Sequence, residues 1–199
     1  MSGAFPISTA KFSTMGIKSI QTTIISKSDS GKKLARQIDG QRFAFSVRIV
    51  TGNRSDIYGE LMAFIMKQRS GKENFTIVPP EIKNARGTAS GSPTGTASAG
   101  ATSITLGGTG TGTLLSGDYI KFSNHDKVYM VVADQSDIST GSLTIEPPLT
   151  TAVSSTDIAF DNVAFTVYLT NDIQEFGAVG ADKDGNIIYE YQFDVEESL

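Results

Sequence analysis

The sequence predicts an all-β protein with one α-helix, in which a β-sandwich domain receives a small inserted β-barrel or sandwich domain. Three observations predict this fold. Apolar and polar residues alternate with a period of two near both ends of the chain, a single stretch has helical periodicity, and an uncharged glycine-rich run separates these regions from a second group of short strands. With 199 residues, of which 39% are hydrophobic, the chain is long enough to bury a sizeable core.

The strands expected for the sandwich lie at residues 42–49, 163–169 and 187–195. In each segment every second residue is apolar, which is typical of a strand with one buried and one solvated face. The predicted buried side chains are Phe43, Phe45, Val47, Ile49, Val163, Phe165, Val167, Leu169, Ile187, Tyr189, Tyr191, Phe193 and Val195. We expect the last two strands to pair antiparallel.

A tight turn is predicted before the last strand. Asp184-Gly185 is a strong hairpin signal, because both residues tolerate a positive φ. The longer pattern Asp182-x-Asp184-Gly185-Asn186 resembles part of a calcium loop, but it lacks the remaining ligands and the bidentate glutamate. A turn is therefore expected here, and no metal site.

One helix is predicted at about residues 55–70. Asn53 or Ser55 can cap its start and Gly71 can end it. Its apolar stripe consists of Ile57, Leu61, Phe64 and Ile65, widened by Met62 and Met66. The two methionines fit either core filling or an adaptable binding face.

The middle of the chain has its own strand pattern. Residues 87–100 are polar and rich in Gly, Ser and Thr, which is typical of an entry linker, and residues 102–158 hold short β-type runs separated by turn residues. The run GGTGTGT at 107–113 is expected to be a flexible loop inside this domain and not a phosphate-binding loop. The predicted core residues are Ile120, Phe122, Val128, Met130, Val132, Leu143 and Ile145.

The charge distribution favours the same division into domains. Residues 1–86 carry 14 Lys/Arg against 6 Asp/Glu, whereas residues 159–199 carry 1 against 9, and the net charges of +8 and −8 cancel. We therefore expect residues 1–86 plus 159–199 to fold together as a discontinuous sandwich, with residues 87–158 as the inserted domain.

Composition excludes several classes of function. The chain has no cysteine, so disulfides, thiolate zinc sites and cysteine nucleophiles are ruled out. Its one histidine, His125, lies in the run Ser-Asn-His-Asp and is expected to be a polar loop residue rather than part of a catalytic triad. We expect no enzyme activity and no catalytic, cofactor-binding or metal-binding residues.

No apolar run reaches the roughly 20 residues of a membrane span, and residues 1–6 do not resemble a signal peptide. We therefore expect the protein to stay in the cytoplasm where it is made.

Basic side chains near the start of the chain raise the possibility of nucleic-acid binding. They are Lys32, Lys33, Arg36, Arg42 and Arg48. Arg42 and Arg48 alternate with apolar residues, as on an ordinary solvated strand face, and the isoelectric point of about 5.0 argues against a dedicated DNA-binding protein. Two interpretations remain: these residues meet acidic residues of a neighbouring subunit, or they are simply solvated.

Several motifs resemble phage distal tail and minor tail proteins. The order of the basic segment GKKLARQIDGQRFAFSVRI, a helix ending in AFIMKQRSGKENFTIVPP, and later strands is similar to the N-terminal domain of that family. The segment GDYIKFSNHDKVYMV, followed by LTIEPPL, is similar to the inserted domain of many such proteins. The resemblance covers most of the chain, although its motifs, which include Gly71, Phe75 and Pro79-Pro80, are short and structural.

The resemblance implies a structural virion protein of the phage tail tip or baseplate. Such a subunit forms a ring, typically six-fold, that joins the tail tube to the hub or baseplate; its partners would be other copies of itself, the tube protein and the hub or baseplate proteins. Such a subunit would be assembled in the host cytoplasm and located in the virion. The resemblance implies no contact with a membrane, no sequence-specific binding of nucleic acid and no catalytic residue.

Two other functions are alternatives to a structural tail protein. A carbohydrate-binding module that contacts a host-surface glycan would need exposed aromatic rings, but the chain has no Trp, and Tyr119 and Tyr129 lie in predicted strands. A cell-wall hydrolase would need a carboxylate pair with one raised pKa, which the sequence does not suggest. The structural tail protein is the interpretation that the sequence favours, and the carbohydrate-binding module is the alternative.

Overall fold

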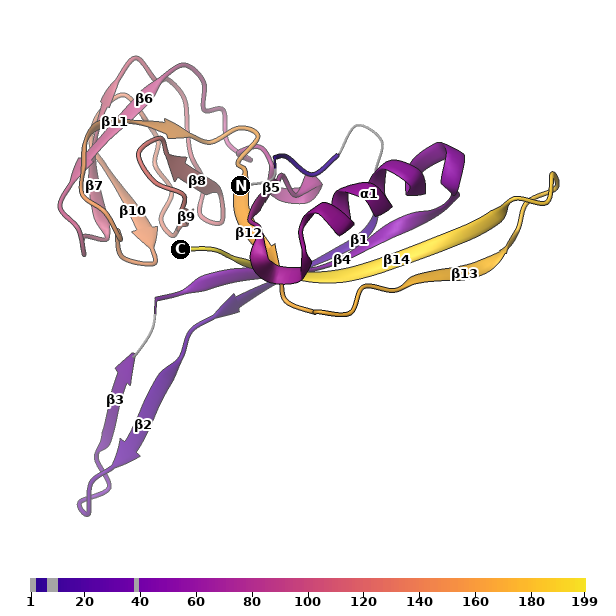
Figure 1. Ribbon diagram of the computed structural model, residues 1–199. Helices are drawn as coiled ribbons and strands as arrows, with labels where there is room; N and C mark the ends of the chain where they lie inside the picture. The colour runs from indigo at the N-terminus through magenta and orange to yellow at the C-terminus, as the bar shows by residue number, and fades with distance from the viewer. Residues whose placement is uncertain (1–2, 7–10, 38–39) are drawn as a thin grey trace.

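The computed structural model describes residues 3–6, 11–37 and 40–199. Residues 1–2 belong to the segment 1–6 that is not expected to be a signal peptide, and they lie outside the described residues. Figure 1 shows a long twisted sheet with helix α1 along it, a barrel beside the sheet, and a two-stranded hairpin that projects away from both. The prediction of an all-β fold with one α-helix is confirmed.

The sheet has the strand order β1-β4-β14-β12-β5, and β13 pairs with the part of β14 that β12 leaves free. All of its pairings are antiparallel. Its strands are β1 (Phe12–Ile20), β4 (Arg42–Asn53), β5 (Phe75–Ile77), β12 (Phe165–Leu169), β13 (Phe176–Ala181) and β14 (Ile187–Glu197). The antiparallel pairing of β12 with β14 confirms the prediction for the last two expected strands.

The predicted alternation on these strands is largely confirmed. Every second residue from Phe43 to Ile49 is buried, as are the apolar residues of β12 and the second half of β14. Ile187 is an exception, because β14 extends beyond the helix that covers its other apolar residues, and this side chain is exposed. Tyr189 is partly buried.

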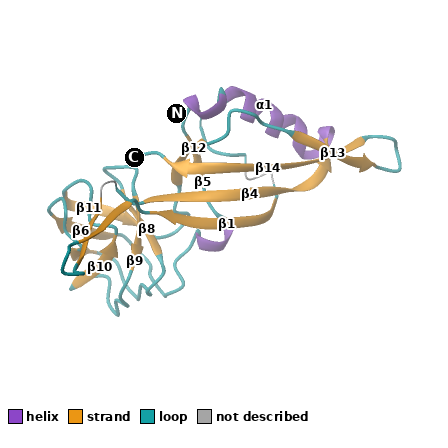
Figure 2. Cartoon of the chain, turned by 90° about the horizontal axis from the view of Figure 1, so that it is seen from below, coloured by secondary structure: helices purple, strands orange, loops and turns teal. Residues whose placement is uncertain are grey.

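The strands form one sheet, in place of the two facing sheets of a sandwich. Helix α1 lies along the apolar face of the sheet, as Figure 2 shows from another side. Leu61 and Ile65 of the helix, together with Ile57 just before it, are buried in the same core cluster as the strands. The apolar stripe of the helix therefore supplies the cover that a second sheet would supply in a sandwich.

The helical segment begins and ends differently from the prediction. Asn53 caps it as expected, since its side-chain oxygen accepts a hydrogen bond from the amide of Asp56 at 2.9 Å. The first turn, Arg54–Tyr58, is a π-helix, and α1 proper runs over Gly59–Lys67. The helix ends through Arg69, which has a left-handed φ of 52°, and the prediction that Gly71 ends it is wrong.

Gly71 has another role. A Cβ atom at this position would lie 2.5 Å from the carbonyl oxygen of Leu169, so a glycine is needed where the chain passes close to β12. Two short 3-10 turns, Ser70–Lys72 and Pro80–Ile82, flank β5. Met66 of the helix is exposed, whereas Met62 and Phe64 are only partly buried.

The barrel is closed, with the strand order β10-β7-β6-β11-β8-β9. Its strands are β6 (Pro93–Ala97), β7 (Ser103–Gly108), β8 (Tyr119–Phe122), β9 (Val128–Val131), β10 (Ser142–Glu146) and β11 (Val153–Ala159). The predicted linker 87–100 therefore contains a barrel strand, β6, which the sequence prediction missed. The strand lacks large apolar residues because it approaches the core closely: a Cβ on Gly95 would lie 2.8 Å from side-chain atoms of Ile104 and Phe122.

The run 107–113 is held by hydrogen bonds, contrary to the expectation of a flexible loop. Gly107 and Gly108 belong to β7. Beyond them, Ser90 and Thr111 exchange two backbone hydrogen bonds of 2.9 Å each. The hydroxyl of Thr113 accepts from the amide of Thr88 at 3.1 Å. The start of the expected linker is thus joined by hydrogen bonds to the end of the expected loop.

The side chains of β9 lie on the opposite faces of the strand from those predicted. Tyr129 and Val131 are buried in the barrel core, whereas Val128 is buried against the core of the sheet, with Met130 packed beside it. Val132 is exposed. The sequence could not reveal this, because both faces of β9 are covered, one by the barrel and one by the sheet, and both sets of residues are therefore apolar.

Candidate interaction surfaces

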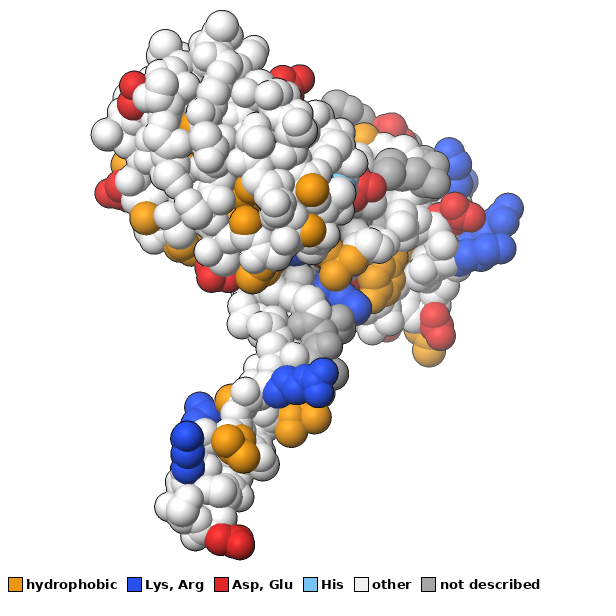
Figure 3. Space-filling view, turned by 90° about the vertical axis from the view of Figure 1, so that its left-hand side faces the viewer, with side chains coloured by type: hydrophobic (Ala, Val, Ile, Leu, Met, Phe, Trp, Pro, Cys, Tyr) orange, Lys and Arg blue, Asp and Glu red, His pale blue; other side chains and the backbone are white. Residues whose placement is uncertain are grey.

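The hairpin formed by β2 (Thr23–Lys27) and β3 (Lys33–Gln37) is called the arm from here on. Every residue of both strands is exposed, and Figure 3 shows the arm standing clear of the rest of the molecule. The turn at its end is closed by a hydrogen bond of 3.0 Å from the amide of Ser28 to the carbonyl of Lys32, and Gly31 takes a positive φ of 79°.

The arm combines apolar and basic side chains. Ile24 and Ile25 are each 57% exposed and Leu34 is 51% exposed, which is unusual for large aliphatic side chains. Lys27 lies directly opposite Lys33 across the two strands. Like charges in this position destabilise a strand pair, so the arm is better suited to a bound state than to isolation in water.

The basic residues singled out in the sequence separate into two groups. Arg42 and Arg48 of β4 form ion pairs within the chain, with Glu196 at 3.0 Å and with Glu190 at 2.5 Å. These two arginines therefore serve the sheet itself. Lys32, Lys33 and Arg36 belong to the arm, and within residues 3–6, 11–37 and 40–199 no ion pair joins them to a carboxylate.

A second surface follows β13, from the loop before this strand to its turn into β14 at the far end of the sheet. It is called the tip and comprises residues 172–187. Its exposed apolar side chains are Ile173 (86%), Val179 (50%) and Ile187 (48%). Its acidic residues are Asp172, Glu175, Asp182 and Asp184, and its one basic residue is Lys183, which lies 3.6 Å from Asp184. Figure 1 shows the arm and the turn of the tip extending from opposite ends of the molecule.

The turn of the tip confirms the predicted hairpin. The carboxylate of Asp182 accepts hydrogen bonds of 2.9 Å from the side chain of Asn186 and from the backbone amides of Asn186 and Asp184. These bonds, that of the Asn186 side chain first, hold the pKa of Asp182 below its usual range. Gly185 has a φ of 83°, as the turn requires. The strand before this turn is β13, which the sequence prediction missed because FGAVGA lacks the alternation of a half-buried strand.

The barrel and the sheet meet at a buried ion pair. Lys127 of the barrel and Glu197 at the end of β14 lie 2.5 Å apart, and their side chains are 3% and 0% exposed. Glu197 also accepts hydrogen bonds from the amides of Phe43 and Val128, and Lys127 donates a further bond of 3.0 Å to Gln41. Burial lowers the pKa of Lys127, while the charge of Glu197 opposes that shift.

Sequence reasoning missed this pair, although one signal was present. Phe193, Val195 and Glu197 are alternate residues of β14 and therefore share its buried face. The alternation alone thus places the charged Glu197 side chain on the core side of the strand. Aromatic rings complete the junction, since Tyr119 of the barrel packs edge-on against Phe43 and Phe165 of the sheet, with ring centres 5.5 and 5.9 Å apart.

His125 lies in the turn between β8 and β9, as predicted. Its Nδ1 is 2.7 Å from the side-chain oxygen of Asn124 and its Nε2 is 2.8 Å from the hydroxyl of Tyr129. This arrangement suits the neutral tautomer, in which Nδ1–H donates to Asn124 and Nε2 accepts from Tyr129. Burial, assisted by the charges of Lys121 and Lys127, lowers the pKa of His125.

We expect His125 to make stability depend on pH. Because its pKa is lower in the fold than the 6.5 of a free imidazole, the unfolded chain takes up a proton first as the pH falls. Stability that is present above that value should be lost as the pH falls through it. His125→Gln, which can keep a hydrogen bond but does not titrate, should show a smaller loss between about pH 7 and about pH 5.5 in urea unfolding. Equal losses in wild type and variant would contradict the assignment.

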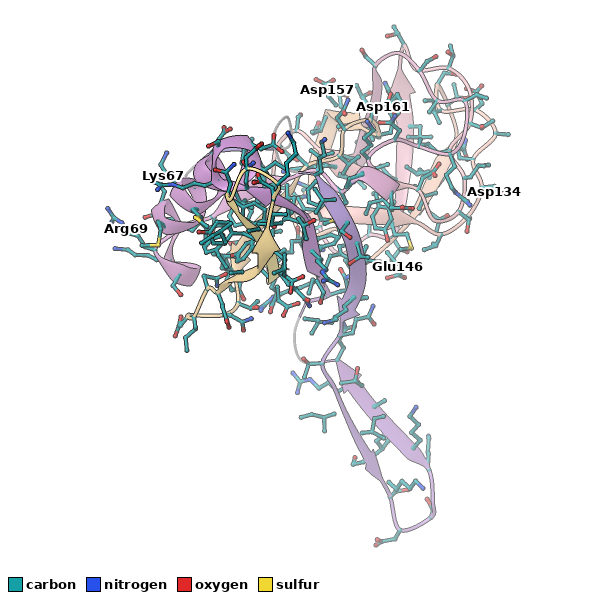
Figure 4. The ribbon with its side chains drawn as sticks, turned by 90° about the vertical axis from the view of Figure 1, so that its right-hand side faces the viewer. Lys67, Arg69, Asp134, Glu146, Asp157 and Asp161 are labelled. Carbon is teal, nitrogen blue, oxygen red and sulfur yellow. The ribbon has the colours of Figure 1, made fainter. Side chains whose placement is uncertain are left out.

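A pocket of about 560 Å³ opens on the barrel beside this histidine. Asp126 lines it but is paired with Lys121 at 2.9 Å, and the contact lowers the pKa of Asp126. Tyr119 and Tyr129, the rings considered for sugar binding, are both buried, so neither offers a stacking surface. Asp157 also lines the pocket, whereas Figure 4 shows Asp134 and Glu146 on other sides of the barrel.

Within residues 3–6, 11–37 and 40–199, no group of three or more His, Asp or Glu side chains is placed to hold a metal ion. None of the helices that the structure describes has the length and apolar character needed to cross a membrane.

The barrel resembles a domain of a known protein family. Residues 83–163, which include all six barrel strands, match the family described as distal tail protein pb9, B domain. No curated protein matches the chain. This match confirms the resemblance to phage distal tail proteins that the sequence predicted. A domain of this kind indicates a structural component of a phage tail, which implies contact with other tail proteins.

Proposed function

We propose that this protein is a ring-forming subunit of the phage tail tip that joins the tail tube to the hub or baseplate. The observation that carries the proposal is the pair of unlike surfaces that extend from opposite ends of the molecule, the basic arm and the acidic tip. Surfaces of this kind fit a head-to-tail contact, in which each copy uses one surface toward each of its two neighbours. Such contacts close into a ring when the rotation between copies allows it.

Ring closure would place each copy in the same relation to the tail axis. The barrel is fixed to the sheet through Lys127 and Glu197, so all copies would present it in one orientation. A ring of this kind has two different faces, one for the tube protein and one for the hub or baseplate. From the family resemblance we expect six copies.

The proposal assigns no catalytic step. Both ring nitrogens of His125 are engaged in hydrogen bonds, which supports a structural role for that residue. The carbohydrate-binding alternative gains no support from the barrel, because Tyr119 and Tyr129 are buried and do not line its pocket. A glycan array probed with the purified protein would test that alternative directly.

The mass in solution and the place in the virion test the proposed function. Sedimentation over a concentration series should reveal an assembly of several copies, and antibodies against the chain should label the tip of purified tails in electron micrographs. A chain that stays monomeric at every concentration and salt level, and is absent from purified tails, would overturn the proposal.

We also propose the domain division expected from the sequence: residues 1–86 plus 159–199 as one unit and residues 87–158 as an inserted unit. Its support is that the chain enters and leaves the barrel at the same place, where the amide of Ala85 donates to the carbonyl of Phe160 at 3.0 Å. A fragment of residues 83–163 should then unfold cooperatively on its own. A fragment without a cooperative transition would argue for a single unit.

A further inference from the structure

We propose that the arm of one copy binds the tip of the next copy. The inference rests on the proposed ring function and deepens it, because it names the two surfaces that meet. The inference is drawn from the apolar cover and the counter-charges that the arm does not find within its own chain. The partner that it names is a second copy of this chain.

The arm lacks a cover for its apolar residues. On one face of the ribbon Ile25 lies opposite Ala35, and on the other face Ile24 and Leu34 are diagonal neighbours. Neither face packs against the body of the protein, because all ten strand residues are exposed. A two-stranded ribbon is only marginally stable in water, so a binding partner that buries these side chains would hold it in shape.

The arm also lacks counter-charges. Lys27 and Lys33 face each other, and Lys32 lies next to them in the turn. The arm's turn contributes one carboxylate, Asp29. A partner surface with several carboxylates and exposed aliphatic side chains would relieve the repulsion and cover the apolar residues together.

The tip has these properties. It carries four carboxylates and one lysine, Lys183, along the loop before β13, the strand itself and the turn after it. The three aliphatic side chains on this stretch, Ile173, Val179 and Ile187, are at least 48% exposed. In addition, β13 is paired with β14 on one side, and the described residues place no strand on its other side. An open strand edge of six residues can accept a strand of the arm, whose strands have five residues each.

The contact cannot form within one chain. The arm and the turn of the tip extend from opposite ends of the molecule, and the long strands of the sheet separate them. Charge complementarity therefore acts between copies. Since the two surfaces differ, the contact is head-to-tail, and every copy donates one arm and receives another.

Reciprocal charge reversal tests this contact. The arm variant is Lys27→Glu with Lys33→Glu, and the tip variant is Glu175→Lys with Asp184→Lys. Asp182 and Asp172 are left unchanged, because Asp182 organises the turn and Asp172 accepts a hydrogen bond from Ser70. Lys11→Glu with Lys72→Glu is the matched control, since both lysines are exposed and lie outside the arm and the tip.

Each variant alone should assemble at least about tenfold more weakly than wild type in sedimentation, because like charges would meet at every contact. An equimolar mixture of the two should recover assembly, with the copies alternating around the ring. The control should assemble like wild type. Circular dichroism and thermal unfolding identify a variant that fails to fold, in which case Lys27→Gln with Lys33→Gln or Glu175→Gln with Asp184→Asn replaces it.

The outcomes separate the two proposals. If wild type and both variants assemble equally well, the arm–tip contact is wrong while the ring function stands. If the mixture stays monomeric although each variant is folded, the pairing of these two surfaces is likewise overturned. A wild-type chain that never assembles and is absent from tails removes the ring function itself.

Chemical cross-linking gives an independent measurement. The chain has no cysteine, so Ile25→Cys in one preparation and Val179→Cys in another introduce single thiols on the arm and on the tip. A short bis-maleimide should link the two variants into dimers when they are mixed. Val132→Cys, on an exposed part of the barrel, is the matched control for the tip thiol. Equal cross-linking of the arm to the control would contradict the contact.

Discussion

Replacing Lys127 with methionine is expected to lower the free energy of unfolding by about 3–5 kcal/mol, because the substitution leaves the buried Glu197 carboxylate without its cation. Glu197 keeps its hydrogen bonds from the amides of Phe43 and Val128, which satisfy its oxygens but do not neutralise its charge. Urea unfolding followed by circular dichroism measures the loss. Lys183→Met is the control, since Lys183 is highly exposed and its contact with Asp184 is a weak surface pair.

A second substitution shows whether the charge is the cause. Lys127→Met combined with Glu197→Gln should lose less stability than the sum of the two single variants, because the double variant buries no unpaired charge. Additive losses would mean that the two groups act independently. A loss of under about 1 kcal/mol for Lys127→Met alone would mean that water reaches the pair.

Phe165→Ala is the other large effect that we expect, at about 3–5 kcal/mol. Phe165 is fully buried in β12, and its ring packs edge-on against Phe43, Phe45 and Tyr119, at centre distances of 5.8, 4.9 and 5.9 Å. Its removal would open a cavity where the core of the sheet meets the barrel. Because three other rings line the site, the surrounding residues can close little of that cavity.

Phe64→Ala is the matched comparison. Periodicity alone predicts that Phe64 is buried with Leu61 and Ile65, but the structure places it at the edge of the core, where it is only partly buried against Phe5 and Phe75. Its truncation should therefore cost less than that of Phe165, at about 1–3 kcal/mol. Equal losses at the two positions would show that helix α1 packs more deeply than the structure describes.

The sequence predicts well those elements in which one face is buried and the other is solvated. Residues 42–49 and 165–169 have such faces, and their alternation identified both the strands and the buried side chains. Prediction failed where that asymmetry is absent. Strand β9 is covered on both sides, and β6 approaches the core so closely that Gly95 replaces a large side chain.

The candidate surfaces were predictable only in part. The basic residues of the arm were noted in the sequence, but its projection was not, because nothing local distinguishes a strand that leaves the body from one that stays in it. Likewise, β13 contains two glycines and two alanines and has no apolar period. The ion pair of Lys127 with Glu197 joins residues 70 positions apart, which a single sequence cannot bring together, although the facing of β14 marks Glu197 as buried.

Strand β14 has a mechanical consequence for a tail. It runs from Ile187, at the tip, to Glu197, against the barrel, and it pairs with β4 from Ile188 to Glu196 with one register shift between Tyr189 and Tyr191. Hydrogen bonds in an antiparallel pair lie perpendicular to the strands, so a force along β14 loads many of these bonds together, in shear. We therefore expect tension at the tip to be transmitted to the barrel with little elastic loss, since no loop lies in between.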